Sequence, residues 1–439
     1  MSDATKTRRR HFLHDTALGM AGFVASTPVG SSLARAAGAN ERVRVALIGC
    51  GGRGNHVAGV FAERDDVELA FLADCHQDRL AVSAKKHPRA EAVGDFRRVL
   101  DDKTVDAVIQ ATPVHWHAPG TIMACEAGKH VYVEKPCSHN IREGRLLVEA
   151  ARRNNRIVQH GTQVRSTSTI MAGIQLLREG VIGEVFQAKA WNIQRRPGVG
   201  RGQQISPPAA LDYEKWLGPV PAVPYHDTFM SGWNWQPEFG TGEIGNDGIH
   251  DLDYARWGLG VDTHPTFISA AGGRYLYHNG SPFADTQQVC FEYAPDGTGN
   301  KKLLMYEQRL WSTNYPHNCD SGVEYYGTAG QMFLSRRGKL EVLLERNKRH
   351  SVDVPLEPQN TESHVANFIE SIRNDRRPHA DAEIAHLTAS VCHLGNIATG
   401  LGRSLHFNPE KERFVDDDQA NSVLQREYRP GHWAAPSGA

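Results

Sequence analysis

The sequence predicts an α/β protein in which a doubly wound parallel sheet precedes an α/β domain with a large, open, mainly antiparallel sheet. Short apolar runs alternate with helix-length segments up to about residue 160, a pattern typical of parallel βαβ units. Beyond residue 250, strand-like runs follow one another closely and alternate apolar with polar residues, which indicates antiparallel pairing. The chain has 439 residues, enough for two or three domains with cores of their own.

The first half of the chain is expected to form the parallel sheet. Its predicted strands are 43–48, 67–73, 105–110, 130–133 and 157–159. Helix-length segments separate them, and in one of these, 141–154, Leu146, Leu147 and Ala150 recur at helical spacing.

The pattern changes after about residue 162. A helix over 169–179 and a strand over 185–191 lead into a long stretch rich in glycine and proline, 195–239, of a kind that is usually functional in a compact domain. The antiparallel strands are expected at 266–271, 286–293, 302–310, 323–326, 331–334 and 339–344, and two helices at 363–373 and 384–401. The tail after about Asn408 is polar and gives little indication of a fold.

The first 37 residues have the order of an export signal. Arg9 and Arg10 precede a mildly apolar stretch, 17–29, and a small-residue pattern that ends at Ala37. This order is typical of a twin-arginine secretory signal, with a disordered basic tail as the alternative. We therefore expect a periplasmic or otherwise exported protein without a membrane span in its mature form. The expected division is a signal over 1–37, a nucleotide-binding domain over 42–161, a substrate-binding domain over 162–407 and a tail over 408–439.

The charge and histidine content exclude some classes of partner. The formal net charge is −1 and no run of like charge stands out, so neither nucleic acid nor an anionic membrane is indicated. The chain has 22 histidines, but none with the spacing of a closed zinc site. The nearest candidate, His115-Trp116-His117, lacks nearby partners, and no metal is expected.

A glycine-rich loop, Gly49-Cys50-Gly51-Gly52-Arg53-Gly54, joins the first predicted strand to a helix. Glycines permit a turn tight enough for a dinucleotide pyrophosphate to rest on the backbone N–H groups of the helix N-terminus. Asp74 follows the second strand about 20 residues later, where this fingerprint needs an acid for the adenosine ribose. An acid there repels a 2′-phosphate, which favours NAD over NADP, although Arg53 could reach such a phosphate.

Two polar motifs follow the predicted strands 105–110 and 130–133. Thr112-Pro113-Val114-His115-Trp116-His117 is placed to contact the nicotinamide ribose, with a structural turn as the alternative. Glu134-Lys135-Pro136 lies where a doubly wound sheet presents its ligand, so Glu134 and Lys135 are also expected at the cofactor. Lys135 could take a proton from a substrate hydroxyl if burial lowers its pKa. The alternative is a surface ion pair with Glu134.

A third polar cluster spans 245–253. If a helix continues through it, Asn246 and His250 lie on one face. A histidine with a polar partner can relay protons near neutral pH, whereas a buried histidine that bonds only to backbone is the structural alternative.

Together these motifs resemble the Gfo/Idh/MocA oxidoreductase family, which includes glucose–fructose oxidoreductase and inositol dehydrogenase. The resemblance runs from about Arg42 to Arg403. It implies a Rossmann domain joined to an α/β domain whose open sheet backs a sugar pocket and forms dimers. It also implies that Lys135 and His250 match the family's catalytic lysine and histidine, and that Pro136 is cis.

The sequence departs from the family at one position. Members commonly have aspartate four residues before the histidine, where this chain has Asn246. Because an amide cannot accept a proton, either His250 works with Lys135 alone, or Asp247 or Asp253 supplies the carboxylate. Some exported, glycosidase-like members also diverge in this stretch.

The expected function is therefore an NAD(P)-dependent oxidoreductase acting on a sugar or polyol hydroxyl. The alternatives are a glycosidase working by transient oxidation, elimination and re-reduction, and a non-catalytic sugar-binding homologue. Free nicotinamide nucleotide is scarce outside the cytoplasm, so we expect a tightly held cofactor and redox-closed turnover. A homo-oligomer through the second sheet is also expected.

Eight residues are expected to contact the carbohydrate. They combine the catalytic candidates with polar groups after the last parallel strand and with tryptophans able to stack on a sugar ring, for which core packing is the alternative. These are Lys135, Gln163, Arg165, Trp191, Trp233, Trp235, Asp247 and His250.

Overall fold

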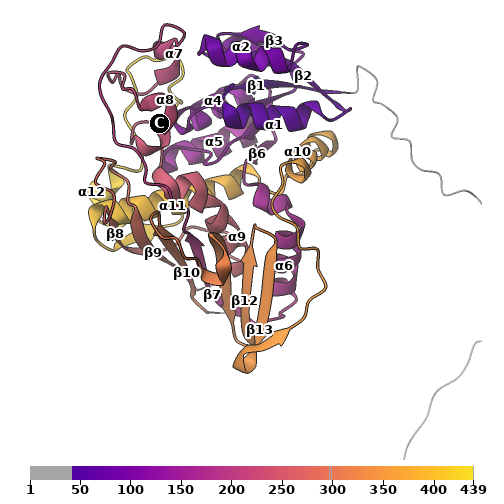
Figure 1. Ribbon diagram of the computed structural model, residues 1–439, viewed down its shortest axis with the longest axis vertical. Coiled ribbons are helices and arrows are strands. Elements are labelled where there is room, and N and C mark those ends of the chain that lie inside the picture. The colour runs from indigo at the N-terminus through magenta and orange to yellow at the C-terminus, as the bar shows by residue number, and fades with distance from the viewer. Residues whose placement is uncertain (1–41, 296, 298, 439) are drawn as a thin grey trace, which may run out of the picture. The chain divides into compact units, whose positions relative to one another are not determined.

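The computed structural model describes residues 42–295, 297 and 299–438, and the predicted export signal lies outside them. Two sheets organise these residues (Figure 1). Among the described helices, none is both long and apolar enough to cross a membrane.

The first sheet has six parallel strands in the order β3-β2-β1-β4-β5-β6. They are β1 (Val43–Ile48), β2 (Val67–Ala73), β3 (Glu91–Val93), β4 (Ala107–Gln110), β5 (His130–Val133) and β6 (Val158–His160). The predicted doubly wound sheet is confirmed. The short edge strand β3 was not predicted, because two of its three residues are exposed and it carries no apolar run. The strand order reverses between β1 and β4, which opens a crevice at the carboxyl ends of the strands.

Helices cover both faces of this sheet. They are α1 (Gly52–Ala62), α2 (Gln77–Lys86), α3 (Arg97–Asp101), α4 (His117–Glu126) and α5 (Ile141–Arg153). A further helix comes from far along the chain, α10 (Glu362–Asn374). Its Phe368 ring lies 6.0 Å from those of both Phe61 and Tyr132, so α10 completes the core on the α1 face.

The second sheet has ten strands in the order β14-β13-β12-β11-β7-β10-β9-β8-β15-β16. They are β7 (Val185–Asn192), β8 (Phe267–Gly273), β9 (Thr286–Tyr293), β10 (Lys302–Arg309), β11 (Ser321–Gly327), β12 (Gly330–Ser335), β13 (Lys339–Leu344), β14 (Lys348–His350), β15 (Leu405–Asn408) and β16 (Arg413–Phe414). Only β7 and β10 pair in parallel, so the prediction of an open, mainly antiparallel sheet is also confirmed.

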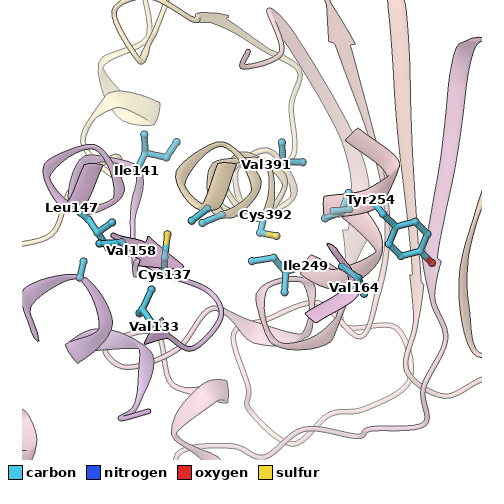
Figure 2. Packing of buried hydrophobic residues seen from close by; sticks show 14 of the residues in the cluster. Val133, Cys137, Ile141, Leu147, Val158, Val164, Ile249, Tyr254, Val391 and Cys392 are labelled. Carbon is cyan, nitrogen blue, oxygen red and sulfur yellow. The ribbon is translucent and has the colours of Figure 1, made fainter. Parts of the chain in front are cut away.

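Three long helices pack on this second sheet, α6 (Ser168–Arg178), α9 (Ile249–Leu259) and α11 (Ala382–Leu401). Helix α11 also packs against α5 of the first sheet, and one apolar core therefore runs through both sheets. Figure 2 shows its middle, where Val391 and Cys392 of α11 lie between Leu147 of α5 and Ile249 of α9.

The tail after Asn408 is folded, although its sequence gave little indication of it. It forms β16 and the short helix α12 (Asp418–Asn421). Glu412 fixes it to the body of the protein: one carboxylate oxygen accepts hydrogen bonds from His264 Nε2 at 2.9 Å and His386 Nε2 at 2.8 Å, and from Arg145 Nη2 at 2.7 Å. The ligand atoms of Glu412 and the two histidines lie within 4.8 Å of one another, but the Arg145 guanidinium holds the same oxygen and disfavours a metal ion there.

We expect Glu412→Gln to lower the free energy of unfolding at pH 7 by about 2–3 kcal/mol, because it removes the charge that two buried histidines and the partly exposed Arg145 share. Burial alone would raise the pKa of Glu412, but its hydrogen bonds from His264, His386 and Arg145 lower it. Its contribution is therefore complete above the unfolded-state pKa of about 4.3 and is lost as the pH falls below it.

Denaturant unfolding at pH 7 and pH 4 measures this contribution, with the exposed Glu410→Gln as the control. An equal loss of stability in the two variants would contradict the assigned anchor.

Candidate active site

The glycine-rich loop joins β1 to α1 at the crevice of the first sheet. Gly49 has a φ of +97°, and a Cβ there would lie 2.6 Å from the carbonyl oxygen of Ala111. A Cβ on Gly54 would lie 1.9 Å from the carbonyl oxygen of Gly49. A Cβ on Gly51 or Gly52, in contrast, would meet nothing within 4 Å. Gly49 and Gly54 therefore permit the tight turn, whereas Gly51 and Gly52 leave open space in front of it.

That open space is a cavity of about 570 Å³, within the range of small-molecule sites. Of the expected cofactor residues, the cavity is lined by Gly49, Gly51, Gly52, Arg53, Asp74, Thr112 and Pro113. Residues 215, 216, 230 and 233 of the long Gly- and Pro-rich stretch also line it.

Asp74 lies at the end of β2 and faces this cavity. Its two carboxylate oxygens accept hydrogen bonds from the backbone N–H groups of Cys50 and His76, each at 2.7 Å. Burial raises the pKa of Asp74, and these two bonds oppose that shift. An open cradle above Gly51 and Gly52, with a carboxylate beside it, fits the pyrophosphate and ribose of a dinucleotide.

The two histidines of the turn after β4 are buried and bond to backbone. His115 Nε2 lies 2.8 Å from the carbonyl oxygen of Trp216, and His117 bridges the carbonyl oxygens of Pro136 and Thr112 at 2.6 and 2.7 Å. Burial lowers the pKa of both, that of His115 to about 3. Neither ring lines the cavity, so these histidines hold the turn in place through backbone contacts and do not contact the cofactor site.

Glu134 and Lys135 follow β5 and face different partners. The buried Glu134 carboxylate accepts a hydrogen bond from Arg53 Nε at 2.7 Å, which links the end of β5 to the glycine-rich loop. Arg53 is thus held by Glu134 rather than by Asp74. The Lys135–Pro136 peptide is cis, as the resemblance implied.

The ammonium of Lys135 crosses to the second domain. Nζ donates to the backbone oxygen of Asn246 and, at 3.2 Å, to its side-chain Oδ1. Burial lowers the pKa of Lys135 from its usual value, against the opposing charges of Asp247 and Glu134. A lysine in this setting is closer to the neutral, proton-accepting form than an exposed one.

The segment that carries Asn246 is a single π-helical turn, Ile244–Gly248, which runs directly into α9. Such wide turns are frequent at functional sites. Glycine is required within it, because a Cβ on Gly248 would lie 2.2 Å from the hydroxyl of Tyr306. His250 is the second residue of α9, is only 4 % exposed, and its Nδ1 has no partner among the described residues. Burial lowers the pKa of His250 well below its usual value, so the ring is neutral at pH 7.

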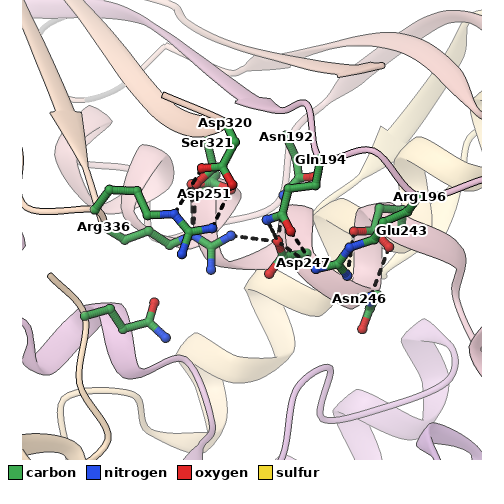
Figure 3. Close-up of polar contacts among 12 residues, drawn as sticks. Asn192, Gln194, Arg196, Glu243, Asn246, Asp247, Asp251, Asp320, Ser321 and Arg336 are labelled. Carbon is green, nitrogen blue, oxygen red and sulfur yellow. Dashed lines mark hydrogen bonds and ion pairs between the residues drawn. The ribbon is translucent and has the colours of Figure 1, made fainter. Parts of the chain in front are cut away.

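Asp247, one of the two carboxylates expected to serve His250, faces away toward the second sheet. Figure 3 shows its carboxylate bonded to Arg336 at 2.8 Å, to Asn192 at 3.1 Å and to Gln194. Burial alone would raise the pKa of Asp247, but the charge of Arg336 and its neighbours holds it far below the usual range. The other candidate, Asp253, is fully buried and bonded to Arg165 Nε and Thr388 Oγ1, each at 2.7 Å. Both carboxylates are therefore hydrogen-bonded to groups other than His250.

Glu243 is a carboxyl group beside Asn246 that sequence reasoning missed. Its Oε2 accepts a hydrogen bond from Asn246 Nδ2 at 3.0 Å, and its Oε1 lies 3.0 Å from Arg196 Nη1. Burial raises the pKa of Glu243 to about 7. Its spacing of three residues before Asn246 was the available signal, because side chains three residues apart are neighbours on a helical turn.

The expected carbohydrate contacts are only partly brought together. Trp191 is fully buried and stacked on Phe333, with ring centroids 5.6 Å apart, so the core-packing alternative holds for it. Arg165 is paired with Asp253 and stacked on Trp257, away from Lys135. Trp235 is 6 % exposed, whereas Trp233 lines the nucleotide cavity.

Gln163 donates to the hydroxyl of Tyr132 at 2.9 Å and is buried. The groups that lie together are therefore Lys135, Asn246 and Glu243, with Arg53 and Glu134 linking them to the cavity.

Comparison with family models gives two matches. Residues 43–162 match the Gfo/Idh/MocA model described as an oxidoreductase family with an NAD-binding Rossmann fold. Residues 190–434 match the model for the C-terminal alpha/beta domain of the same oxidoreductase family.

Similar curated proteins come from Shewanella. A "Glycosyl hydrolase family 109 protein" of strain W3-18-1 is 29 % identical over 206 residues, covering 42 % of this chain and 45 % of that protein. An "Alpha-N-acetylgalactosaminidase" of Shewanella oneidensis is 31 % identical over 159 residues, covering 34 % of this chain and 35 % of that protein. The chain thus matches less than half the length of these relatives.

Solved structures share the fold. A levoglucosan dehydrogenase in complex with NADH and levoglucosan superposes with a TM-score of 0.66 at 18 % identity, over 83 % of this chain and 99 % of that one. An aldose–aldose oxidoreductase from Caulobacter crescentus gives a TM-score of 0.64 at 18 % identity, over 83 % of this chain and all of that one.

Replacing Asp74 with asparagine tests its predicted contact with the adenosine ribose. Asp74→Asn keeps an acceptor for one of the two backbone N–H groups but removes the charge that binds ribose hydroxyls and repels a 2′-phosphate. We expect the Kd for NAD to rise about tenfold and that for NADP to change little or fall, as measured by calorimetric titration. Equal losses for the two nucleotides would remove Asp74 as the ribose acid.

Proposed function

Since the chain belongs to the Gfo/Idh/MocA oxidoreductase family, we propose that it is an NAD-dependent oxidoreductase acting on a hydroxyl group of a sugar or polyol. The observation that carries this proposal is the position of Lys135. Its strand end is joined through Glu134 and Arg53 to the nucleotide loop, and its ammonium is held by Asn246 of the second domain. A substrate between the two domains can therefore contact the lysine and lie beside the cofactor cavity.

NAD, when bound, supplies the acceptor for a hydride. The chain's own residues handle the proton. Lys135 accepts it at Nζ from the substrate hydroxyl, which requires the neutral amine that burial favours. The backbone and side-chain oxygens of Asn246 fix the direction of Nζ, and the neutral ring of His250 is assigned to orient a substrate oxygen.

The aspartate usual in the family is replaced here by a pair of residues. Asn246 contacts Lys135 without bringing a charge, and Glu243 stands behind it with a pKa near 7. A neutral amide beside Nζ leaves the lysine pKa low, whereas a carboxylate there would stabilise the ammonium. We therefore assign Lys135 as the base, with His250 as an orienting group and Asn246 as the holder of Nζ.

A second candidate function is an NAD-dependent glycosidase, in which a ring hydroxyl is oxidised, the glycosidic bond is eliminated and the carbonyl is reduced again. The named activity of the Shewanella oneidensis relative favours it. Both functions use the same cofactor and base. A third candidate, a sugar-binding protein without catalysis, is disfavoured by the presence of Lys135 in this setting.

Export and tight cofactor retention belong to the same proposal. The twin-arginine pattern of the first 37 residues supports a periplasmic location, and a cofactor loaded before export supports turnover that returns the hydride within one cycle. The second sheet carries its long helices on one face, which supports a homo-oligomer through the other face.

The decisive experiment is to unfold the purified protein, identify the nucleotide released, and supply sugars and aryl glycosides. Oxidised sugar without release of an aglycone supports the dehydrogenase, and aglycone release without net reduced nucleotide supports the glycosidase. A protein that binds nucleotide and converts neither class of substrate would contradict both.

Replacing Lys135 tests its role as the base. We expect Lys135→Ala to reduce kcat by about 10²- to 10⁴-fold while leaving nucleotide binding intact, because the side chain does not line the nucleotide cavity. Lys135→Arg is the matched control: it keeps the positive charge but cannot give up its proton, so it should be equally inactive. Turnover retained by either variant in a steady-state assay would contradict the assignment of Lys135 as the base.

Replacing Asn246 with aspartate tests the reason for an amide at this position. A carboxylate beside Lys135 Nζ should raise the lysine pKa and move the rising limb of the pH–rate profile to higher pH by about one unit or more. The profile of kcat/KM between pH 5 and 10 measures the shift, with Asn246→Ala as the uncharged control. An unchanged limb in Asn246→Asp would reduce position 246 to a structural role.

A further inference from the structure

The last residues of the chain return to the first domain. After α12, the segment 425–438, which we name the tail strap, runs along α5 toward the turn that follows β4. Its first anchor is Glu143, whose side chain has no exposed surface. The Glu143 carboxylate accepts hydrogen bonds from Arg426 Nε at 2.7 Å and from the Tyr428 hydroxyl at 2.5 Å. Arg426 also donates to the carbonyl oxygen of His115 at 2.7 Å. The strap is thus held by a buried, charge-assisted contact.

A second anchor joins the strap to the long Gly- and Pro-rich stretch. The backbone N–H of Arg429 donates to the carbonyl oxygen of Pro219 at 2.8 Å, and its Nε donates to that of Gly218 at 3.0 Å. These carbonyls directly follow helix α7 (Tyr213–Leu217), whose Lys215 and Trp216 line the nucleotide cavity. The strap and this part of the wall are therefore one connected assembly.

Near its end the strap places a tryptophan on the cavity itself. Trp433 is among the lining residues, together with Gly94, Asp95 and Phe96, which follow β3. Its ring centroid lies 6.0 Å from Phe96 and 5.8 Å from Trp116, and the Arg97 guanidinium lies 4.5 Å from it. Despite these neighbours the indole is 43 % exposed. A large apolar ring held in place, yet partly bare at a cavity, is a ready surface for a flat ligand group.

The position of Trp433 in the nucleotide cavity indicates which part of a dinucleotide its ring would contact. Strand β3 pairs with β2, and the end of β2 carries Asp74, the expected ribose acid. Phe96 and Arg97 follow β3, on the far side of β2 and β1 from β5, whose end carries Lys135. Trp116 reaches these rings from the turn after β4, with its ring centroid 5.4 Å from that of Phe96. Trp433 therefore lies with the adenosine half of a dinucleotide rather than with the reacting half.

We propose that the tail strap completes the nucleotide site, with Trp433 packing against the adenine end of NAD and the two anchors slowing its release. The strap crosses the cavity rim between Phe96 and α7, so an adenosine leaving by that side must displace it. Upstream of Trp433, Arg426 and Tyr428 hold the strap on a carboxylate whose side chain has no exposed surface, which limits how far the strap can move. The inference rests only on nucleotide binding, and not on the proposed sugar chemistry.

The experiment measures release of NADH from the full-length protein. Purified protein is loaded with NADH and mixed with excess NAD, and the loss of bound-NADH fluorescence gives the release rate without any sugar present. We expect Trp433→Ala to release NADH about 10- to 100-fold faster than the unmodified protein, since stacking of a base on an aromatic ring has this magnitude. Trp433→Phe, which keeps a flat ring, should stay close to the unmodified rate.

Two further variants separate the strap from general effects of mutation. Arg429→Ala removes the side-chain hydrogen bonds from the strap to Gly218 while keeping the backbone bond to Pro219, alters no residue of the cavity, and should also speed release. Trp311→Ala removes a tryptophan that is 37 % exposed but does not line the cavity, and should leave the rate unchanged. Release rates of Trp433→Ala and Arg429→Ala equal to that of Trp311→Ala, with unchanged thermal unfolding, would overturn the proposal.

The outcome is independent of the chemistry. A protein that holds NADH through its strap but converts no sugar would refute the proposed function and leave this inference standing. A protein that oxidises sugars, yet releases NADH equally fast with and without Trp433, would support the proposed function and refute the role of the tail strap.

Discussion

The candidate active site depends on one contact between the two domains, the bond from Lys135 at the end of β5 to Asn246 in the π-helical turn. A parallel sheet presents its ligands at the carboxyl ends of its strands, so a base carried there can act only if the second domain closes over it. Helix α11 packs against both α5 and α9 and brings that turn to the strand end. The cofactor cavity, the lysine and the histidine are therefore aligned by one shared core.

Most of the charged side chains around this contact are paired with a side chain of opposite charge. Arg53 is held by Glu134, and Arg336 and Arg196 surround Asp247. What remains beside Lys135 is an amide and a carboxyl group whose pKa is raised to about 7. Pairing the strong charges with each other keeps the interior stable, because an unpaired buried ion costs several kcal/mol. It also leaves the lysine pKa to be determined mainly by burial.

Much of the fold could be predicted from local sequence, and the parts that could not depend on contacts between residues far apart in the chain. The bounds of β1, β2, β5, β9 and β13 agree with those read from apolar runs. Helix α10 was predicted as a helix, but nothing in its sequence says that Phe368 packs on Phe61 of the first domain. The tail strap was not predicted, since Arg426 and Arg429 hold it only through partners far away in the sequence, Glu143 and Pro219.

The site divides in the same way. By itself the sequence determined the glycine-rich loop, the acid that follows β2 and the lysine that follows β5, because these depend on backbone stereochemistry and on spacing along the chain. Only the tertiary structure decided which groups titrate. Asp247 is held ionised by Arg336, 89 residues away, and Glu243 is raised by burial beside Asn246. The ionisation of a side chain depends on its burial and on charges that folding brings close to it. Neither can be inferred from its neighbours in the sequence.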